Sequence, residues 1–343
     1  MGRSTKRTPV YKSFAATESK KFSNNFSAKH KDRIRSYASL YTLTIMGENT
    51  KRWILFIFLA IAWGSSFLIM KRGLRSFDYI QIGSLRIAFA WLLATVIALR
   101  SFGKLRKQHL LPLIGVGILG NGLPYYLFPL AITKLDSGLV GVFNSMVPLF
   151  TLIIGAVFFT TSFLRKQLFG VIVGFSGAMI LLQPTTNPEQ NIWYAGFAIV
   201  ASICYAFSVN IIGNKLKEMP SIAITSLSLL FVGPPALIYV FAGTNFIEVM
   251  QTDPLAYENL AYIAVLGMVN SALAIIIFNQ LIKNSSPLFA SSVTYLIPIV
   301  ALLWGVWDGE KINILHLAGM ATILLGVWLV NGKKRRKRAT TYA

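Results

Sequence analysis

The chain of 343 residues is poor in charge and nearly free of cysteine. Charged residues make up 13% of it, about half the share of an ordinary soluble domain, whereas 55% of the residues are hydrophobic and the mean hydropathy is +0.60. Such a chain is neither a water-soluble globular protein nor a disordered one. Its single cysteine, Cys204, excludes an intrachain disulfide and a cysteine-rich metal site.

Several catalytic signatures are also absent. The sequence has no Gly-x-x-x-x-Gly-Lys-Ser/Thr phosphate loop, no His-Glu-x-x-His zinc motif and no Gly-x-Ser-x-Gly nucleophile motif. It has no potassium-channel filter, and no acidic or histidine cluster that an enzyme of lipid-linked substrates would need. The sequence therefore predicts neither an enzyme nor a metal or cofactor site.

Positive charge is concentrated at the two ends of the chain. The formal net charge is +21, but 12 of the 33 Lys and Arg residues lie in residues 1–52 and six in residues 333–338. A nucleic-acid surface would need this charge on a folded face, so we expect no nucleic-acid partner and anionic lipid headgroups at both ends. We predict a disordered basic extension at 1–52, with Met46 as the true start, and a basic cytoplasmic tail at 331–343.

Between these ends lie long apolar runs. A membrane-crossing helix needs about 20 mostly apolar residues, and continuous runs of this length exclude an outer-membrane barrel. The runs cover residues 53–70, 79–99, 110–132, 139–159, 167–182, 193–213, 222–241, 260–282, 288–307 and 314–330. The predicted fold is an all-α integral membrane protein with ten transmembrane helices.

The loops predict the orientation. With the N-terminus inside, 27 Lys and Arg residues fall on the cytoplasmic side and five on the other. Because basic loops stay in the cytoplasm, we expect a multi-pass protein of the cell membrane (plasma or inner membrane) with both termini cytoplasmic.

The chain also contains an internal repeat. Residues 62–66 align with 204–208, and residues 144–155 align with 294–305. Pairs 149 or 150 positions apart are Asn121 and Asn270, Phe128 and Phe278, Pro148 and Pro298, Gly155 and Gly305, Gly170 and Gly319, and Gly177 and Gly326. The halves, 53–182 and 193–330, have five predicted spans each. Since five is odd, the second half must be inverted, which is a recurring basis of secondary transporters.

Several motifs resemble a known family. They are Trp-Gly-Ser-Ser-Phe at 63–67, Ser-Leu-Arg-Ile-Ala-Phe at 84–89, the region of Pro148, and Gly170-x-x-x-Gly174-x-x-Gly177. Their order resembles the EamA-type branch of the drug/metabolite transporter superfamily over residues 51–332. The resemblance implies a ten-helix exporter or importer of small metabolites, with a central cavity and driven by a gradient without ATP.

Polar residues inside the spans are the candidate substrate-cavity residues. They are Trp63, Ser66, Arg86, Asn121, Tyr125, Asn144, Asn270, Asn279 and Tyr295. Hydrogen bonding between helices is the alternative role for each of them. Arg86 is the only formal charge well inside a predicted span, and it either contacts an anion or clamps backbone carbonyls at the end of another helix.

Two further sets of residues have predicted mechanical roles. Pro148 and Pro298 are paired hinges or merely tolerated kinks. Close packing of the fifth and tenth spans, within the chain or between two copies, is expected at Gly170, Gly174, Gly177 and Gly326.

The leading functional hypothesis is a secondary transporter of small organic metabolites, namely amino acids or related solutes. Alternating access around a cavity between the repeats would move them, with efflux as the expected direction. The alternative is a flippase of lipids or lipid-linked metabolites with the same fold, which would need a lateral opening. The sequence predicts no particular oligomeric state.

Overall fold

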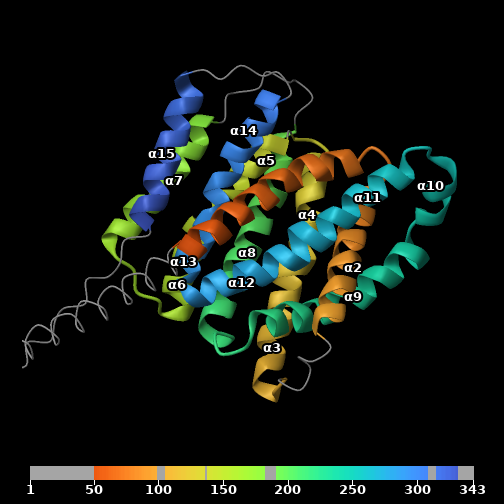
Figure 1. Ribbon diagram of the computed structural model, residues 1–343, viewed down its shortest axis with the longest axis horizontal. Coiled ribbons are helices and arrows are strands. Elements are labelled where there is room, and N and C mark those ends of the chain that lie inside the picture. The colour runs from red at the N-terminus through yellow and green to blue at the C-terminus, as the bar shows by residue number, and fades with distance from the viewer. Residues whose placement is uncertain (1–49, 99–104, 136, 182–190, 308–313, 331–343) are drawn as a thin grey trace, which may run out of the picture. The chain divides into compact units, whose positions relative to one another are not determined.

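In a computed structural model, residues 50–98, 105–135, 137–181, 191–307 and 314–330 are described, and all their regular elements are helical (Figure 1). The chain divides into two units, residues 1–54 and 55–343, and the contacts given below all lie within the second. The predicted start at Met46, most of the predicted extension at 1–52 and the predicted tail at 331–343 lie outside the described residues.

Each half of the chain is a succession of helices, several of them interrupted. The first half contains a helix at Thr50–Gly73, α2 (Tyr79–Ala98), α3 (Lys107–Val116), η2 (Gly117–Gly122), α4 (Leu123–Ile132), α5 (Ser137–Asn144), α6 (Val147–Phe159) and α7 (Arg165–Leu181). The second half contains η3 (Ile192–Tyr194), α8 (Ala195–Lys215), α9 (Ser221–Gly243), α10 (Phe246–Thr252), α11 (Ala256–Gly267), η4 (Met268–Leu273), α12 (Ala274–Asn284), α13 (Pro287–Ser291), η5 (Ser292–Leu296), α14 (Ile297–Trp307) and α15 (Ile314–Val330).

Seven described helices are long and apolar enough to cross a membrane. They are Thr50–Gly73, Tyr79–Val96, Lys107–Ile132, Leu139–Phe159, Ile192–Lys215, Ser221–Gly243 and Ala256–Asn284. Shorter helices occupy the other three predicted spans, namely α7 with 17 residues and apolar helices at Pro287–Val300 and Leu317–Val330. The ninth predicted span is not one continuous α-helix, because its segment η5 winds as a 3-10 helix. The chain is thus a multi-pass membrane protein whose described part is all-helical.

Large apolar side chains form much of the surface as well as the core, unlike in a soluble protein. Large apolar side chains point outward, as at Val96 (72% exposed) and Val157 (66%). Many polar side chains are buried inside instead, among them Gln81, Ser84 and Asn210. In hydrocarbon an outward apolar side chain is favourable, whereas a polar group needs a partner within the protein. The outward faces of these helices therefore suit contact with lipid.

The two sequence halves interleave and do not form separate domains. The second helix of each half packs on its counterpart, α2 against α9, and the last helices α7 and α15 pack together (Figure 1). Helix α8 of the second half packs against α4 and α6 of the first. Any space enclosed at the centre is therefore walled by residues from both halves.

At one end of the helices, the segment after the first helix contacts the segment around α10. Asn259 Nδ2 donates to Ser76 Oγ (2.7 Å), and Gln81 Nε2 donates to Asn245 Oδ1 (3.0 Å). The Ser76 hydroxyl and the Leu255 backbone N–H donate to Asp253 and hold the pKa of its carboxyl group below the usual value. These bonds fix two segments, one from each half, at the same end.

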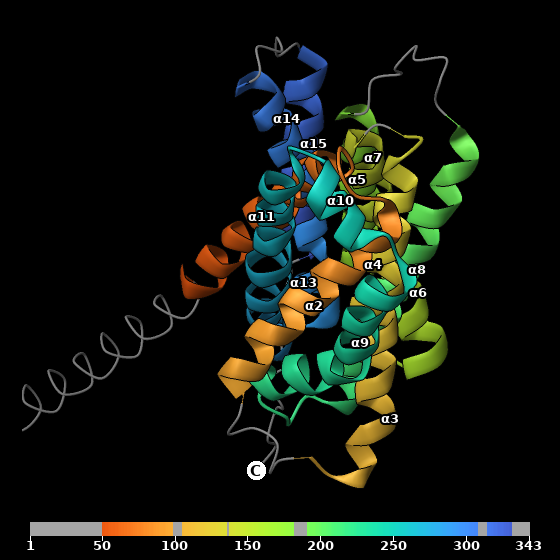
Figure 2. The ribbon, with the colours of Figure 1, turned by 90° about the vertical axis from the view of Figure 1, so that its right-hand side faces the viewer.

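The opposite end has contacts of its own. Lys283 Nζ donates to the carbonyl of Met219 (2.7 Å), and Ser221 Oγ donates to Gln280 Oε1 (2.9 Å). Figure 2 shows α10 toward one end of the helices and the start of α3 at the other. The segments joined by these two sets of bonds therefore lie toward opposite ends of the helices.

Glycines allow the closest helix contact, between α7 and α15. A Cβ at Gly326 would overlap the backbone N and Cα of Gly174 and would lie 2.8 Å from the carbonyl oxygen of Gly170. A Cβ at Gly177 would lie 2.6 Å from the backbone nitrogen of Ile323. A Cβ at Gly174 would meet the Tyr295 ring at 2.9 Å. The glycines predicted for helix packing thus lie where the fifth helix meets the tenth within one chain.

We predict that Gly326→Ala destabilises the protein by about 1–3 kcal/mol, because the added methyl group forces α7 and α15 apart. The measurement is the thermal midpoint of detergent-solubilised protein. The matched control is Gly196→Ala on α8, where an added Cβ meets nothing within 4 Å and helix propensity favours alanine. Equal midpoints for the two variants would show that the α7–α15 contact tolerates a side chain.

Candidate functional site

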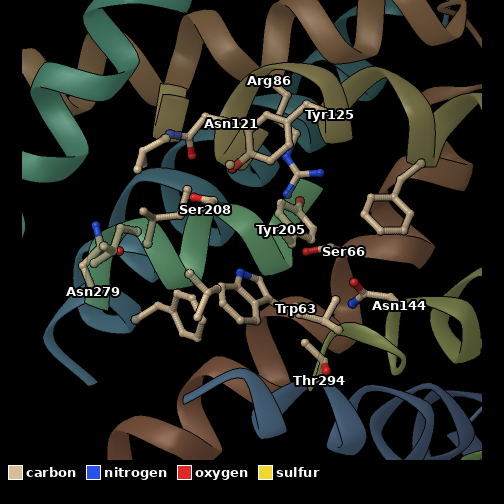
Figure 3. Close-up of a pocket in the computed structure, with 18 of the residues that line it drawn as sticks. Trp63, Ser66, Arg86, Asn121, Tyr125, Asn144, Tyr205, Ser208, Asn279 and Thr294 are labelled. Carbon is tan, nitrogen blue, oxygen red and sulfur yellow. The ribbon is translucent and has the colours of Figure 1, made fainter. Parts of the chain in front are cut away.

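A pocket lies among helices of both halves, and the space free of protein atoms in it, including its part open to solvent, is about 760 Å³ (Figure 3). Its polar and amphipathic lining residues are Trp63, Ser66, Arg86, Asn121, Tyr125, Asn144, Tyr205, Ser208, Asn279 and Thr294. The remaining walls are mostly apolar and include Phe67, Phe128 and Phe278. Apolar walls with a few polar groups are typical of a site for a small organic molecule.

The structure brings together seven of the nine candidate cavity residues. Trp63 and Ser66 come from the first helix, Arg86 from α2, Asn121 from η2, Tyr125 from α4, Asn144 from the end of α5 and Asn279 from α12. The two others, Asn270 and Tyr295, are buried outside the lining of this cavity.

Asn270 joins η4 to the first helix. Its Nδ2 donates to the carbonyl of Ala62 (2.5 Å) and to Ser66 Oγ (3.0 Å), and its own backbone carbonyl accepts from Trp63 Nε1 (3.0 Å). These bonds are the helix-to-helix hydrogen bonding that was the alternative role. Asn270 therefore orients two cavity residues without lining the cavity itself.

Tyr295 lies on the far side of the ninth predicted span from the cavity. Its ring packs against Gly174, and its hydroxyl donates to the backbone carbonyl of Val171 (2.9 Å) in α7. An α-helical period could not assign these two faces, because η5 winds as a 3-10 helix with 3.0 residues per turn in place of 3.6. Thr294, the residue before it, lines the cavity.

Arg86 is buried at 4% exposure and is surrounded by uncharged groups. Its Nε donates to Ser271 Oγ (2.8 Å), its Nη1 contacts Met70 Sδ (3.7 Å), and its guanidinium carbon lies 3.8 Å from the centre of the Tyr125 ring. Figure 3 shows the guanidinium between the rings of Tyr125 and Tyr205. The cavity wall thus carries a positive charge that is held in a fixed position.

Three polar lining residues were missing from the candidate set, namely Tyr205, Ser208 and Thr294. The internal repeat would have found them, because it pairs Trp63 with Tyr205, Ser66 with Ser208 and Asn144 with Thr294. Phe128 and Phe278 form a fourth pair, and both members of all four pairs line the cavity. The cavity walls therefore follow the repeat.

The third and eighth predicted spans widen into π-helical turns, and the first of these turns lines the cavity. These turns are η2 and η4, and each contains one asparagine of the repeat-related pair Asn121 and Asn270. Asn121 Nδ2 donates to Ser228 Oγ (3.2 Å) in α9, and Ser271 Oγ donates to the carbonyl of Leu266 (2.9 Å). Single π turns inside α-helices occur often at functional sites.

The fourth and ninth predicted spans are interrupted at equivalent places. Helix α5 ends at Asn144 and α6 begins at Val147, whereas α13 passes through η5 into α14. Pro148 and Pro298 are each the second residue of the following helix, where a proline removes no intrahelical hydrogen bond. Each interruption therefore precedes its proline, and the proline begins a helix without kinking one.

Two amide oxygens beside the cavity have no hydrogen-bond partner. They are Oδ1 of Asn144 and Oδ1 of Asn279. Asn279 Nδ2 donates to Thr225 Oγ1 (3.0 Å), whose hydroxyl donates to the carbonyl of Ser221, so the free atom of Asn279 is the oxygen. A buried unpaired acceptor costs about 1–3 kcal/mol, and a donor on a bound solute would remove that penalty.

No cluster of three or more His, Cys, Asp or Glu side chains suited to a metal occurs in the described part of the chain. The lining residues offer hydrogen bonds, aromatic faces and a positive charge. This arrangement can select and bind a solute.

Most of the chain is similar in sequence to known and predicted transporters. The profile of the EamA-like transporter family matches residues 51–183 and again residues 192–332. The uncharacterized inner membrane transporter YedA of Escherichia coli K12 is 28% identical, covering 79% of this chain and 88% of its own. A probable amino-acid metabolite efflux pump of Salmonella typhimurium LT2 is 25% identical, covering 84% of this chain and 98% of its own. A protein of known crystal structure shares the fold, with a TM-score of 0.63 at 15% identity, over 82% of this chain and 96% of that one.

We predict that Asn270→Ala lowers the stability of the protein by about 1 kcal/mol, because the first helix loses its side-chain bonds to η4. The matched control is Asn144→Ala, which removes an unpaired oxygen and should leave the thermal midpoint unchanged or higher. The measurement is the thermal midpoint of each variant in detergent. A larger loss for Asn144→Ala would contradict the assignment of Asn270 to structure and Asn144 to the cavity.

Proposed function

The chain belongs to the EamA-like transporter family, and we propose that it exports amino acids or related small organic solutes by alternating access around the central cavity. The family and the names of its relatives indicate a membrane transporter. The substrate class is supported by the amino-acid efflux role named for the Salmonella relative and by the mixed polar and apolar lining.

The observation that carries the proposal is the repeat-related lining of one cavity. Four pairs of equivalent residues, one member from each half, meet there. In an inverted repeat the two halves can exchange conformations, and a site between them then opens to one side or the other. The solute would bind at this shared site while the halves rock around it.

Contacts between connecting segments support ten crossings in two inverted repeats of five. Ten crossings place residues 74–78 and 244–255 on the outer side, where Ser76 bonds Asn259 at the start of α11. They place Lys134 and Asn191 outside as well, and the Asn191 N–H donates to the Lys134 carbonyl (3.2 Å). On the inner side Gln167 Nε2 donates to the carbonyl of Val330 (3.4 Å). Each of these contacts joins segments that ten crossings put on the same side.

The interrupted helices are the parts that would move. The π turns η2 and η4 and the breaks before Pro148 and Pro298 occur at equivalent places in the halves, and residues of η2, of η5 and on both sides of the first break line the cavity. Backbone without regular α-helical bonding at membrane depth is tolerated where it lines a cavity or is buried in protein. We assign the hinges to these four places, with the prolines fixing where the second helical part begins.

The proposal also covers the membrane that holds the chain and the side on which its termini lie. We place the chain in the plasma or inner membrane, consistent with the inner-membrane relative from Escherichia coli, with both termini in the cytoplasm. The basic residues at 1–52 and 333–338 would then contact anionic headgroups.

We predict exchange of amino acids without ATP or an ion gradient. In a counterflow experiment, proteoliposomes loaded with unlabelled amino acids should accumulate the labelled ones above the level of empty liposomes. Ser208→Leu, which fills the cavity, should reduce this exchange at least tenfold, since it removes space that the solute occupies. Ser176→Leu on the exposed face of α7 is the control and should exchange normally.

A fluorescent phospholipid in the same liposomes tests the flippase alternative. Scrambling of the lipid without exchange of any amino acid would refute the proposed solute transport and favour the flippase.

The orientation is tested with single cysteines in a chain whose Cys204 is replaced by alanine. Cysteine at Asn191 should react with a membrane-impermeant maleimide added to whole cells, and cysteine at Lys217 should react only after permeabilisation. Both positions are exposed. The reversed labelling pattern would invert the topology, and labelling of both from outside would contradict ten crossings.

A further inference from the structure

We infer that Arg86 binds a carboxylate group of the transported solute, so that the protein selects monocarboxylates over the corresponding amides and amines. This inference rests on the proposed function and deepens it. It is carried by three observations, which are the missing countercharge, the neutral equivalent contact in the other half and the single positive charge of the cavity.

The guanidinium of Arg86 has no countercharge in the described structure. The acidic residues there are Asp78, Glu218, Glu248, Asp253 and Glu258, and none lines the cavity. The groups around the guanidinium are a hydroxyl, a thioether and phenol rings, all neutral at pH 7. Because a buried charge is unfavourable without a partner of opposite sign, an anion in the cavity supplies what the protein lacks.

The fold does not need a charge at this place. In the first half Arg86 joins α2 to η4 through Ser271 (2.8 Å), and in the second half Ser228 joins α9 to η2 through Asn121 (3.2 Å). The two contacts correspond because each links a second helix to the π turn of the opposite half, although Ser271 is the residue after the repeat partner of Asn121. In the second half a neutral serine and a neutral asparagine make the link that Arg86 and Ser271 make in the first half. Packing alone therefore does not account for the guanidinium.

The expected clamp on backbone carbonyls is not what the structure shows. Among the hydrogen bonds of the described residues, those of Arg86 go to a side-chain hydroxyl and a sulfur. The Ser271 hydroxyl and the Tyr125 ring hold the guanidinium in one orientation. Such preorganisation favours binding, because less freedom remains to be lost when the ligand arrives.

The class of anion follows from charge and shape. No lysine and no second arginine is among the residues that line the cavity. A phosphate monoester carries nearly two negative charges at pH 7 and would stay partly uncompensated there. A carboxylate carries one, and its two oxygens match the planar donors of a guanidinium. The aromatic and aliphatic walls then suit an apolar remainder of the solute.

The experiment uses the full-length protein in proteoliposomes and four isosteric probes. L-leucine carries both charged groups, 4-methylpentanoate only the carboxylate, and L-leucinamide and isoamylamine only the amine. Each competes with counterflow of radiolabelled leucine, and each is tested for thermal stabilisation of the protein in detergent. Leucine and 4-methylpentanoate should compete, whereas leucinamide and isoamylamine should be at least tenfold weaker, since a hydrogen bond to a charged group is lost.

Variants assign this preference to the residue. Arg86→Gln removes the charge and should reduce the preference for leucine over leucinamide at least tenfold. Arg75→Gln removes an exposed charge outside the cavity and should keep the preference. Should Arg86→Gln fail to fold, the four probes on the unaltered protein still decide, because they change the ligand and leave the chain intact.

The outcomes separate this inference from the proposed function. Competition by leucinamide equal to that of leucine, or a full preference retained in folded Arg86→Gln, overturns the carboxylate assignment and leaves solute transport standing. Absence of exchange and of stabilisation for all four probes contradicts solute transport and the carboxylate assignment together.

Discussion

The protein must pair its polar groups without water, because a bilayer interior offers no hydrogen-bond partners. Many of its buried polar side chains obey this constraint locally. Serine and threonine hydroxyls donate to carbonyls one turn earlier, as Ser66 does to Ala62 (3.0 Å). Asn270 and Tyr295 satisfy it across helices. Three groups that depart from it adjoin the cavity, namely the charge of Arg86 and the amide oxygens of Asn144 and Asn279.

The same constraint explains where irregular backbone is tolerated. A π turn or a helix break leaves backbone groups displaced from α-helical bonding, and lipid cannot satisfy them. The structure places η2 and the break after Asn144 next to the cavity, and Asn121 of η2 donates to Ser228.

The repeat and the cavity are two aspects of one arrangement. Equivalent helices pair, α2 with α9 and α7 with α15, so equivalent residues arrive at the same central space. This gives the cavity nearly matched walls from the two halves. Arg86 departs from the match, since the equivalent contact is made by Ser228. A charge on one wall gives a bound solute a preferred orientation in an otherwise balanced site.

The sequence by itself determined the class of protein, because hydropathy and loop charge are sums over many residues and need no contacts. Long apolar runs, basic ends and the 149–150-residue offset predicted an all-helical multi-pass membrane protein of this family, and the family match and the seven long apolar helices confirm that much. Tertiary structure decided which polar residues face the cavity. Asn121 and Asn270 are equivalent in sequence and both bond a neighbouring helix, yet only Asn121 also lines the cavity. That choice depends on which neighbour lies within hydrogen-bond reach, and only the packing of distant helices sets it.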